Sequence, residues 1–351
     1  MKEGSNKIIV GAPTNFGIIY KIQEELCSLG FQVQEFIIKE KKFKYKNIGQ
    51  RLYNLYRKSI LQDYTYKAKL KALASKDDLR KAIDQMSATS YGLIIRPDLY
   101  PVEVLVELRK KVKTLIAYQW DGLDRYPNVR DYIELFDKFY IFDPTDLVQH
   151  PNVLPTTNFH MNSDLVDLSK ASGKSKVYYV GSYEKSRWKT LLDLTSAIER
   201  TNVEKDILLF VGSDTDLYQE VTHRTGITPI QSTISYHKNL QKVKEATVLL
   251  DLQADVHKGI SFRIFEAIGY DKKVITTNDA VKEYDFYDPQ NILVWQNQSS
   301  QELMDFLNSP YADLPDYIKQ KYSLQNWIKY MLDLDSYIPI DLPTGELVEE
   351  L

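Results

Sequence analysis

The stretch HKGISFRIFEAIGYDKKVITTN, from His257 to Asn278, has the pattern of a loop, a helix, a turn and a β-strand. Gly259 and Ser261 are placed to open the helix, and the Ser261 hydroxyl can cap the free backbone N–H groups of its first turn. Gly269 is placed to end the helix, and the β-branched run KKVITT then enters a buried strand. A helix followed directly by an apolar strand is typical of parallel α/β sheets.

The same alternation extends along the whole chain. Apolar, strand-like runs lie at 7–12, 31–38, 92–96, 114–118 and 138–142 in the first half, and at 176–182, 206–213, 247–253, 272–277 and 292–295 in the second. Amphipathic segments separate most of them. Two successive sets of five such runs predict two Rossmann-like domains, each with a parallel sheet covered on both faces.

The length of the chain, 351 residues, also favours two domains, since single cores stop growing at roughly 250–300 residues. The stretch His150–Ser175 is polar, carries Pro, Asn, Ser and Gly, has no strand pattern, and is the expected linker. We therefore expect domains at 1–155 and 156–322, followed by a C-terminal segment, 323–351. This segment has an amphipathic helix with an apolar stripe of Leu324, Trp327, Ile328 and Met331, and ends in an extended, acidic, loosely held tail.

Composition excludes several classes of protein. Hydrophobic residues make up 43% of the chain and charged residues 26%, which argues against wholesale disorder. The single cysteine, Cys27, cannot form an internal disulfide and is expected to be a buried structural thiol. The N-terminal apolar run is too short for a signal peptide, and no stretch approaches the roughly 18–20 apolar residues that span a bilayer. These features predict a cytoplasmic protein.

Positive charge is concentrated between Lys39 and Lys81. This stretch holds 14 Lys and Arg against four acids, a local net charge of +10 in a chain whose net charge is −3. Aromatic residues interleave with the charges. The stretch is compatible with a solvated helical face, with contact to anionic lipid or a lipid-linked acceptor at the inner membrane face, or with nucleic acid. Nucleic acid is the weakest of the three, because the acidic remainder of the chain repels a long polyanion.

Arg263 and Glu266 lie three residues apart on one face of the predicted helix, near its N-terminal end. A helix N-terminus with a nearby guanidinium suits a diphosphate, because the helix dipole and the arginine both favour negative charge. A carboxylate one turn later can accept hydrogen bonds from ribose hydroxyls. The alternative is a surface ion pair between the two residues.

This segment resembles the donor-binding helix of glycosyltransferase-B enzymes, in which a Gly-rich loop precedes a helix with the pattern R-x-x-E-A, a Gly and a V-I-T strand. The pattern is present here as Gly259, Arg263, Glu266, Ala267, Gly269 and Val274–Thr276. The resemblance implies that Glu266 holds the donor ribose and Arg263 the diphosphate. A second match, VGSYEKSRW at 180–188, is similar to the first strand and loop of that family's C-terminal domain. It implies a phosphate-approaching backbone at Gly181 and Ser182, with Lys185 or Arg187 as the adjacent charge.

The sequence departs from the family pattern at one position. Many retaining members have two glutamates separated by seven residues, and the position of the first is Lys258 here. The stereochemical outcome of transfer therefore stays open. The triplet Asp214-Thr215-Asp216 follows a Rossmann-type strand and is interpreted as a loop. The five histidines show no metal-ligand spacing, although His160 and His257 lie near the predicted cleft. We expect no metal and no cofactor, with the nucleotide sugar as a substrate.

The first domain is expected to hold the acceptor and a catalytic base. Asp121 and Asp124 directly follow the predicted strand 114–118, and a transfer that inverts the anomeric carbon needs a carboxylate or His to take a proton from the acceptor hydroxyl. Trp120 could stack on a sugar ring, and Arg96 could bind an acidic acceptor or pair with Asp98. The alternative for Asp121 is a turn residue that caps the next helix. The loop GAPTNFG, at 11–17, lacks the spacing of a dinucleotide fingerprint.

The resemblance implies a bacterial glycosyltransferase that moves a sugar from a nucleotide donor to a glycan acceptor of lipopolysaccharide, capsule or exopolysaccharide. Residues 1–155 would bind the acceptor, 156–322 would bind the nucleotide sugar, and the helix after 323 would cross back to the first domain. The alternatives are a nucleotide-sugar epimerase of the same fold, a non-catalytic two-domain sugar-binding protein, and a degenerate glycosyltransferase that acts only as a subunit of a complex.

Overall fold

The structure is a computed structural model, which describes residues 6–14, 17–38, 43–60, 65–161, 175–201, 203–253 and 258–344. The chain divides into two compact units, Met1–Thr156 and Thr157–Leu351.

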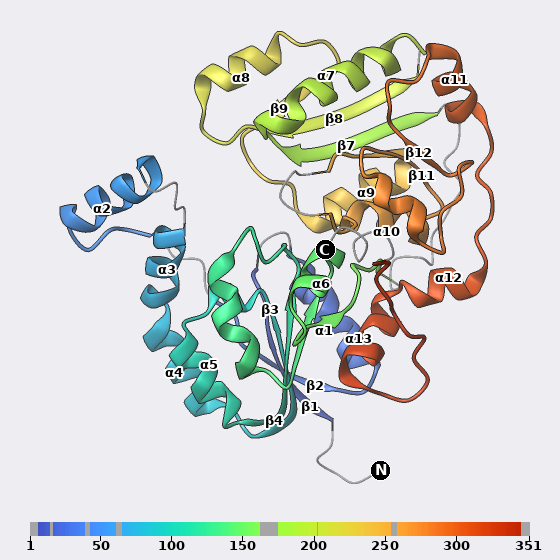
Figure 1. Cartoon of the computed structure of the whole chain (residues 1–351). Helices are drawn as coiled ribbons and strands as arrows, with labels where there is room; N and C mark the ends of the chain where they lie inside the picture. Colours follow the sequence, from blue (N-terminus) through green and yellow to red (C-terminus); the bar gives the residue numbers. More distant parts are fainter. Residues whose placement is uncertain are drawn as a thin grey trace. The chain divides into compact units, whose positions relative to one another are not determined.

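Unit 1 is built around one sheet of parallel strands (Figure 1). The strands are β1 (Lys7–Gly11), β2 (Gln32–Glu35), β3 (Thr89–Ile95), β4 (Val112–Gln119), β5 (Lys138–Ile141) and β6 (Leu154–Pro155). The α-helices are α1 (Ile18–Ser28), α2 (Ile48–Ser59), α3 (Thr65–Ala74), α4 (Lys76–Gln85), α5 (Val102–Arg109) and α6 (Pro144–Gln149). Two 3₁₀ segments, η2 (Pro97–Leu99) and η3 (Pro127–Leu135), follow β3 and β4.

The strand order of unit 1 is β2-β1-β3-β4-β5-β6. The direction of strand succession therefore reverses between β1 and β3, where open α/β sheets bind their ligands. Gly11 ends β1 at this point, and an added Cβ would lie 2.8 Å from Ile94 Cδ1 and 3.0 Å from the hydroxyl of buried Tyr100. A side chain at position 11 would thus displace the core, so packing explains this glycine.

Unit 2 repeats the architecture. Its strands are β7 (Lys176–Ser182), β8 (Glu204–Phe210), β9 (Thr228–Ile230), β10 (Val248–Asp251), β11 (Lys273–Thr276) and β12 (Ile292–Val294). Its helices are α7 (Lys185–Glu199), α8 (Thr215–Thr222), α9 (Tyr236–Glu245), α10 (Phe262–Gly269), α11 (Ser300–Asn308), α12 (Asp316–Lys321) and α13 (Leu324–Leu332), with the 3₁₀ segment η5 (Asp279–Glu283).

The sheet of unit 2 has the order β12-β11-β10-β7-β8-β9, with all strands parallel. On one face, α7 and α11 pack on a core that includes Tyr179 of β7. On the other face α9 and α10 pack on the sheet, and Tyr178 contacts both helices. The two neighbouring tyrosines point to opposite faces because side chains alternate along a strand.

The predicted α/β fold with two Rossmann-like sheets is confirmed, and each of the ten predicted runs overlaps a strand. Two further strands were missed. β6, with two residues, lies within the stretch that we interpreted as a strand-free linker, and β9, with three, follows α8. Both are edge strands and contain a proline, which cannot donate a ladder hydrogen bond. With only two or three residues each, they are too short to show an apolar pattern.

The prediction that Cys27 is buried is wrong, because its thiol is exposed. The buried stripe of α1 contains Ile19, Ile22 and Leu26, and Cys27 lies one residue further around the helix, outside the stripe. The Asp214 triplet is also more than a loop: the Asp214 carboxylate accepts a hydrogen bond from Leu217 N at 3.0 Å and caps α8.

The C-terminal stripe of α13 is buried as expected, and Trp327 packs against Phe159 of the same unit with ring centroids 4.7 Å apart. The crossing of this helix to the first domain stays a prediction. The tail after it is held more firmly than we expected. Asn326 forms two hydrogen bonds with the backbone of Ile338, and Ile340 is fully buried. None of the described helices is long and apolar enough to cross a bilayer.

Candidate active site

The strand order of unit 2 reverses between β7 and β10, and several of the predicted donor-binding residues lie at the carboxyl ends of these strands. Gly181 and Ser182 end β7, and Asp251 ends β10. Ser261 caps α10 as predicted, since its hydroxyl accepts a hydrogen bond from Arg263 N at 3.2 Å. The same hydroxyl donates to Asp251 at 2.6 Å, so the cap is tied to the end of β10.

Asp251 is a buried residue that sequence reasoning missed. Its second carboxylate oxygen accepts a hydrogen bond from the Thr276 hydroxyl at 2.7 Å, so this one side chain connects β10, β11 and the start of α10. The loop before α10 is fixed by two further side chains. Asn278 donates to the carbonyl oxygens of Lys258 and Gly259, and Asn158 donates to that of Ile260. The N-terminus of α10 is therefore rigidly positioned.

Arg187, near the start of α7, connects the ends of β7 and β10. Its guanidinium donates to the carbonyl oxygen of Leu252 at 3.0 Å and to that of Ser182 at 3.5 Å, and it pairs with Glu184 at 3.0 Å. Its Nε is buried and has no hydrogen-bond partner among the described residues. Arg187 thus holds a partly buried positive charge at the point where the strand order reverses.

Arg263 and Glu266 form an ion pair on the inner side of α10, with Arg263 Nη1 and Glu266 Oε2 2.5 Å apart. Asn239 of α9 binds both residues. Its amide donates to Glu266 Oε1 at 3.1 Å, and its carbonyl oxygen accepts from the Arg263 guanidinium at 3.3 Å. The Tyr178 hydroxyl donates to the same oxygen, and the Arg263 guanidinium lies 5.5 Å from the centre of the Tyr178 ring. Asn239 could not be predicted, because nothing in the sequence links α9 to α10.

The ion pair is buried, which differs from the surface ion pair that we considered as the alternative. The side chain of Glu266 is 4% exposed and that of Arg263 is 14% exposed. Burial raises the pKa of Glu266, while the charge of Arg263 and the hydrogen bond from Asn239 oppose the rise. Arg263 is thus the member of the pair that a ligand can reach, and Glu266 lies behind it.

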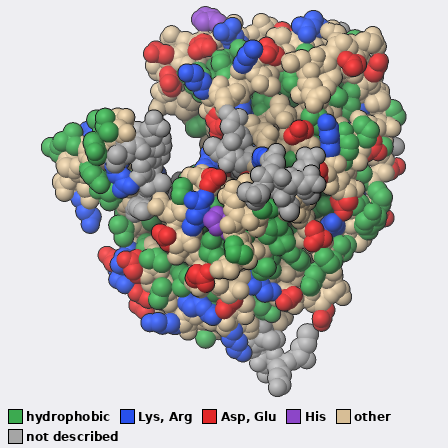
Figure 2. Space-filling view, viewed as in Figure 1, with side chains coloured by type: hydrophobic (Ala, Val, Ile, Leu, Met, Phe, Trp, Pro, Cys, Tyr) green, Lys and Arg blue, Asp and Glu red, His purple; other side chains and the backbone are tan. Residues whose placement is uncertain are grey.

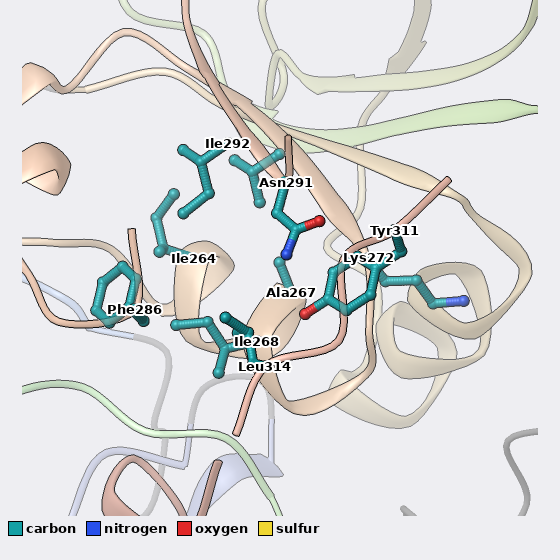
Figure 3. Close-up of a pocket in the computed structure, with 10 residues that line it drawn as sticks. Ile264, Ala267, Ile268, Lys272, Phe286, Asn291, Ile292, Tyr311 and Leu314 are labelled. Carbon is teal, nitrogen blue, oxygen red and sulfur yellow. The ribbon is translucent and has the colours of Figure 1, made fainter. Parts of the chain in front are cut away.

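The opposite face of α10 lines a small pocket with Ile264, Ala267 and Ile268 (Figure 3). Its polar groups already have partners: Lys272 donates to the carbonyl oxygen of Lys244, and Asn291 forms two hydrogen bonds with the backbone of Ala312. An apolar pocket whose polar side chains are engaged does not suit a nucleotide diphosphate.

Gly181 is where the resemblance implies a close approach of the backbone to the donor. The structure adds a reason within the chain, because a Cβ on Gly181 would overlap the Tyr179 hydroxyl. That hydroxyl lies within range of the charges of Arg187, Asp251 and Arg263. The charged side chains of Arg187, Asp251 and Arg263 therefore all lie near the end of β7.

A second cluster lies in unit 1, at the carboxyl end of β3. Arg96 has the left-handed backbone conformation (φ 61°, ψ 63°), which is uncommon for a residue other than glycine. Its Nε and Nη2 each donate to the Asp98 carboxylate at 2.7 Å, and its Nη1 donates to Asp121. The guanidinium lies 4.2 Å from the centre of the Tyr126 ring, and Arg125 Nη1 lies 3.5 Å from Asp121. Backbone strain held by surrounding contacts is frequent at functional sites.

The structure brings Arg96 and Asp121 together but separates Asp124 from them. The Asp124 side chain is 63% exposed and pairs with Arg130. Trp120 is half-buried beside Asp121. Gln119, the residue before it, is fully buried, and neither polar atom of its amide has a partner among the described residues. This unsatisfied amide at the end of β4 is a further sign of a binding site that sequence reasoning missed.

The loop that carries Asp121 is fastened by Asp146 of α6. The Asp146 carboxylate is buried and accepts a hydrogen bond from Leu123 N at 2.8 Å. Burial raises its pKa to about 7, the hydrogen bond from Leu123 opposes the rise, and the neighbouring charges of Asp143 and Asp124 add to it. Asp146 thus holds its proton to a much higher pH than an ordinary aspartate does.

We expect the Asp146→Asn variant to be more stable than the wild type at pH 8. A folded-state pKa above the ordinary value of 3.8 means that the native state binds more protons, so the contribution of Asp146 to stability is present below pH 4 and is lost as the pH rises through about 7. An amide keeps the acceptor for Leu123 without the charge. Thermal melts at pH 5 and pH 8 should show a clearly larger gain at pH 8, by about 2–4 °C for each kcal/mol of added stability. An equal gain at both values would contradict the assignment.

No cluster of potential metal ligands is found within the described ranges of the chain. His160 is a structural residue. It is buried, its Nε2 lies 2.8 Å from the carbonyl oxygen of Lys319, and its ring packs so closely on Gly269 that a Cβ there would overlap it. His257, the other histidine that we considered, lies outside the described residues.

No family model and no curated protein matches the sequence. Solved structures match it over almost the whole length. An alpha-glucosyltransferase in complex with UDP-glucose and DNA containing an abasic site has 12% identity and a TM-score of 0.54, covering 99% of this chain and 98% of that chain. An alpha-glucosyltransferase in complex with UDP and a 13-mer DNA containing a central A:G mismatch has 9% identity and a TM-score of 0.55, covering 92% and 95%. At these identities the likeness shows the fold alone, which is that of a chain with two Rossmann-like α/β units.

Proposed function

Given this fold, we propose that the protein is a glycosyltransferase that moves a sugar from a nucleotide donor to a glycan acceptor. The observation that carries the proposal is the buried Arg263–Glu266–Asn239 cluster behind the capped N-terminus of α10, at the point where the strand order of unit 2 reverses. A Rossmann-like fold does not need buried charge at the ligand-binding edge of its sheet. Such charge, when it is fixed by hydrogen bonds, therefore indicates a functional site.

In this proposal, unit 2 binds the donor. A guanidinium has five N–H donors, and the contacts with Glu266 and Asn239 use three of those of Arg263. The remaining donors and the first N–H groups of α10 bind the diphosphate, where they stabilise the charge that develops as it leaves. Glu266 and Asn239 orient Arg263. The Glu266 carboxylate accepts hydrogen bonds from the ribose hydroxyls once donor binding moves aside the side chains that bury it. Gly181, Ser182 and Arg187 form the opposite wall of the donor site, and no bound metal is needed.

Unit 1 binds the acceptor and supplies the base. Asp121 takes the proton of the acceptor hydroxyl, the hydroxyl oxygen bonds to the anomeric carbon, and the bond from that carbon to the diphosphate breaks, so that the nucleoside diphosphate leaves with the bonding electrons. Arg96 holds Asp121 in place and orients an acidic acceptor, and Trp120 stacks on a sugar ring. We propose a lipid-linked glycan of lipopolysaccharide, capsule or exopolysaccharide as the acceptor.

A panel of nucleoside diphosphates tests the donor site first. We expect one of UDP, GDP or ADP to raise the melting temperature of the full chain, because a ligand that binds only the native state stabilises it by mass action. The matching nucleotide sugar should then yield a glycosylated product only when a glycan acceptor is present, and EDTA should leave the rate unchanged. A rearranged nucleotide sugar formed without acceptor would indicate the epimerase instead. The absence of a shift with every nucleotide would refute the proposal.

A further inference from the structure

Helix α2 in unit 1 exposes its large apolar side chains. Ile48 is 76% exposed, Leu52 59%, Leu55 59% and Tyr56 50%, and Ile60, which follows the helix, is 67% exposed. Figure 2 shows these side chains as a green patch over α2, with Lys and Arg beside it. Contiguous apolar surface of this kind marks an interaction site.

The arrangement of residues around α2 is the reverse of that in an ordinary surface helix. At 100° per residue, Ile48, Leu52, Leu55 and Tyr56 share one stripe, and Arg51 lies at its edge. The side chain turned away from solvent is the polar Asn54, which is 7% exposed. The apolar stripe therefore faces outward.

The helix is held in this orientation by contacts with α3. The rings of Tyr53 and Tyr66 meet edge to face with centroids 4.9 Å apart, and the Arg57 guanidinium lies 5.7 Å and 5.4 Å from the centres of these two rings. Asn47 caps α2 by accepting a hydrogen bond from Gln50 N at 2.9 Å. A capped helix that packs on α3 through Tyr53 and Arg57 presents the aliphatic stripe as a preformed surface.

The sequences of α2 and α3 carry charge of one sign. Residues 43–60 and 65–75 contain eight cations and no acid. These cations are Lys44, Lys46, Arg51, Arg57, Lys58, Lys67, Lys69 and Lys71. A basic helix with an exposed aliphatic stripe has the two features by which interfacial helices bind anionic membranes, namely burial of apolar side chains at the acyl boundary and attraction of Lys and Arg to headgroups.

We propose that α2 docks the protein onto the surface of an anionic lipid bilayer, with Ile48, Leu52 and Leu55 inserted below the headgroups. A second copy of the chain fits the surface less well, since α2 and α3 carry cations and no acid, and pairing two such faces brings those cations together. A nucleic acid would satisfy the cations but would leave the aliphatic stripe in water, because its backbone offers charge and not apolar surface.

Vesicle sedimentation tests the proposal with the full-length protein. We expect it to bind vesicles of phosphatidylcholine with about 30% phosphatidylglycerol at least tenfold more tightly than vesicles of phosphatidylcholine alone, and to lose most of that preference in high salt. Leu52→Glu/Leu55→Glu should reduce partitioning at least tenfold on anionic vesicles. Lys46→Gln/Arg51→Gln should weaken binding several-fold on anionic vesicles only.

The matched control is Val102→Glu/Val106→Glu in α5, which adds the same two charges at residues of unit 1 that are 40% and 44% exposed and lie outside the α2 surface. It should bind vesicles like the wild type. Equal vesicle binding by Leu52→Glu/Leu55→Glu and the wild type would overturn the proposal. So would a wild-type dimer that becomes a monomer in this variant. Tight binding of duplex DNA by a protein that does not bind vesicles would overturn it as well. Leu52→Glu/Leu55→Glu should leave the affinity for UDP unchanged, so failure of the membrane proposal can be distinguished from failure of the proposed donor site.

Discussion

Arg263→Gln is expected to lower the affinity for the nucleoside diphosphate by about 10–100-fold, the loss that corresponds to one or two charge-assisted hydrogen bonds. The same change also leaves Glu266 buried without its cation, which typically costs about 3–5 kcal/mol of stability. A loss of binding in the single variant could therefore reflect unfolding of unit 2. A second variant is needed to separate the two effects.

Arg263→Gln/Glu266→Gln provides that separation. It removes both charges and keeps amide groups that can bind Asn239, so we expect a melting temperature close to that of the wild type but no recovery of affinity in calorimetric titration. Glu266→Gln alone should retain Arg263 and lose affinity less. Burial already raises the pKa of Glu266, so in Arg263→Gln the stability of unit 2 should fall as the pH rises above the ordinary glutamate value. Wild-type affinity in the double variant would exclude Arg263 from the donor site.

The repeating pattern of the sequence was sufficient to predict the fold. The run KVYYVGS has an unbroken apolar centre, Val177 to Val180, because β7 is central and covered on both faces, and its predicted and observed bounds agree. The same holds for Ser261, whose position before an apolar helix predicts a cap that the structure confirms. Edge strands such as β9 give no such signal, because three residues that include a proline bury too little to impose a pattern.

The site was predicted less completely, since it depends on contacts between distant segments. Arg263 and Glu266 are three residues apart and could be paired from the sequence, whereas Asn239 meets them only through the packing of α9 beside α10. Likewise, Arg96 and Asp121 lie 25 residues apart and meet because β3 and β4 are neighbours in the sheet. The left-handed conformation of Arg96 has no sequence signal at all, as glycine would be the usual residue there.

The cluster in unit 1 distinguishes the two aspartates that the sequence offered as bases. Asp121 lies at the end of β4, in contact with a strained arginine and close to a buried, unsatisfied amide, that of Gln119. Asp124, three residues later, is exposed and bound to Arg130. Both are single aspartates of one loop, so they form a matched pair for mutagenesis.

Asp121→Asn is expected to reduce turnover by about 10²–10⁴-fold, the usual contribution of a general base, and to leave the affinity for the nucleoside diphosphate unchanged. The variant should fold, because Arg96 keeps its two hydrogen bonds to Asp98 and an amide has nearly the same size as the carboxylate. Asp124→Asn is the control and should change turnover less than threefold, since it alters only an exposed ion pair. Turnover and calorimetric titration of both variants, with melting temperatures measured alongside, decide the matter. If Asp121→Asn transfers sugar at the wild-type rate, the base must lie elsewhere. If turnover and donor affinity fall together, Asp121 acts on binding and not on the proton, because a base for the acceptor hydroxyl has no role before the acceptor is bound.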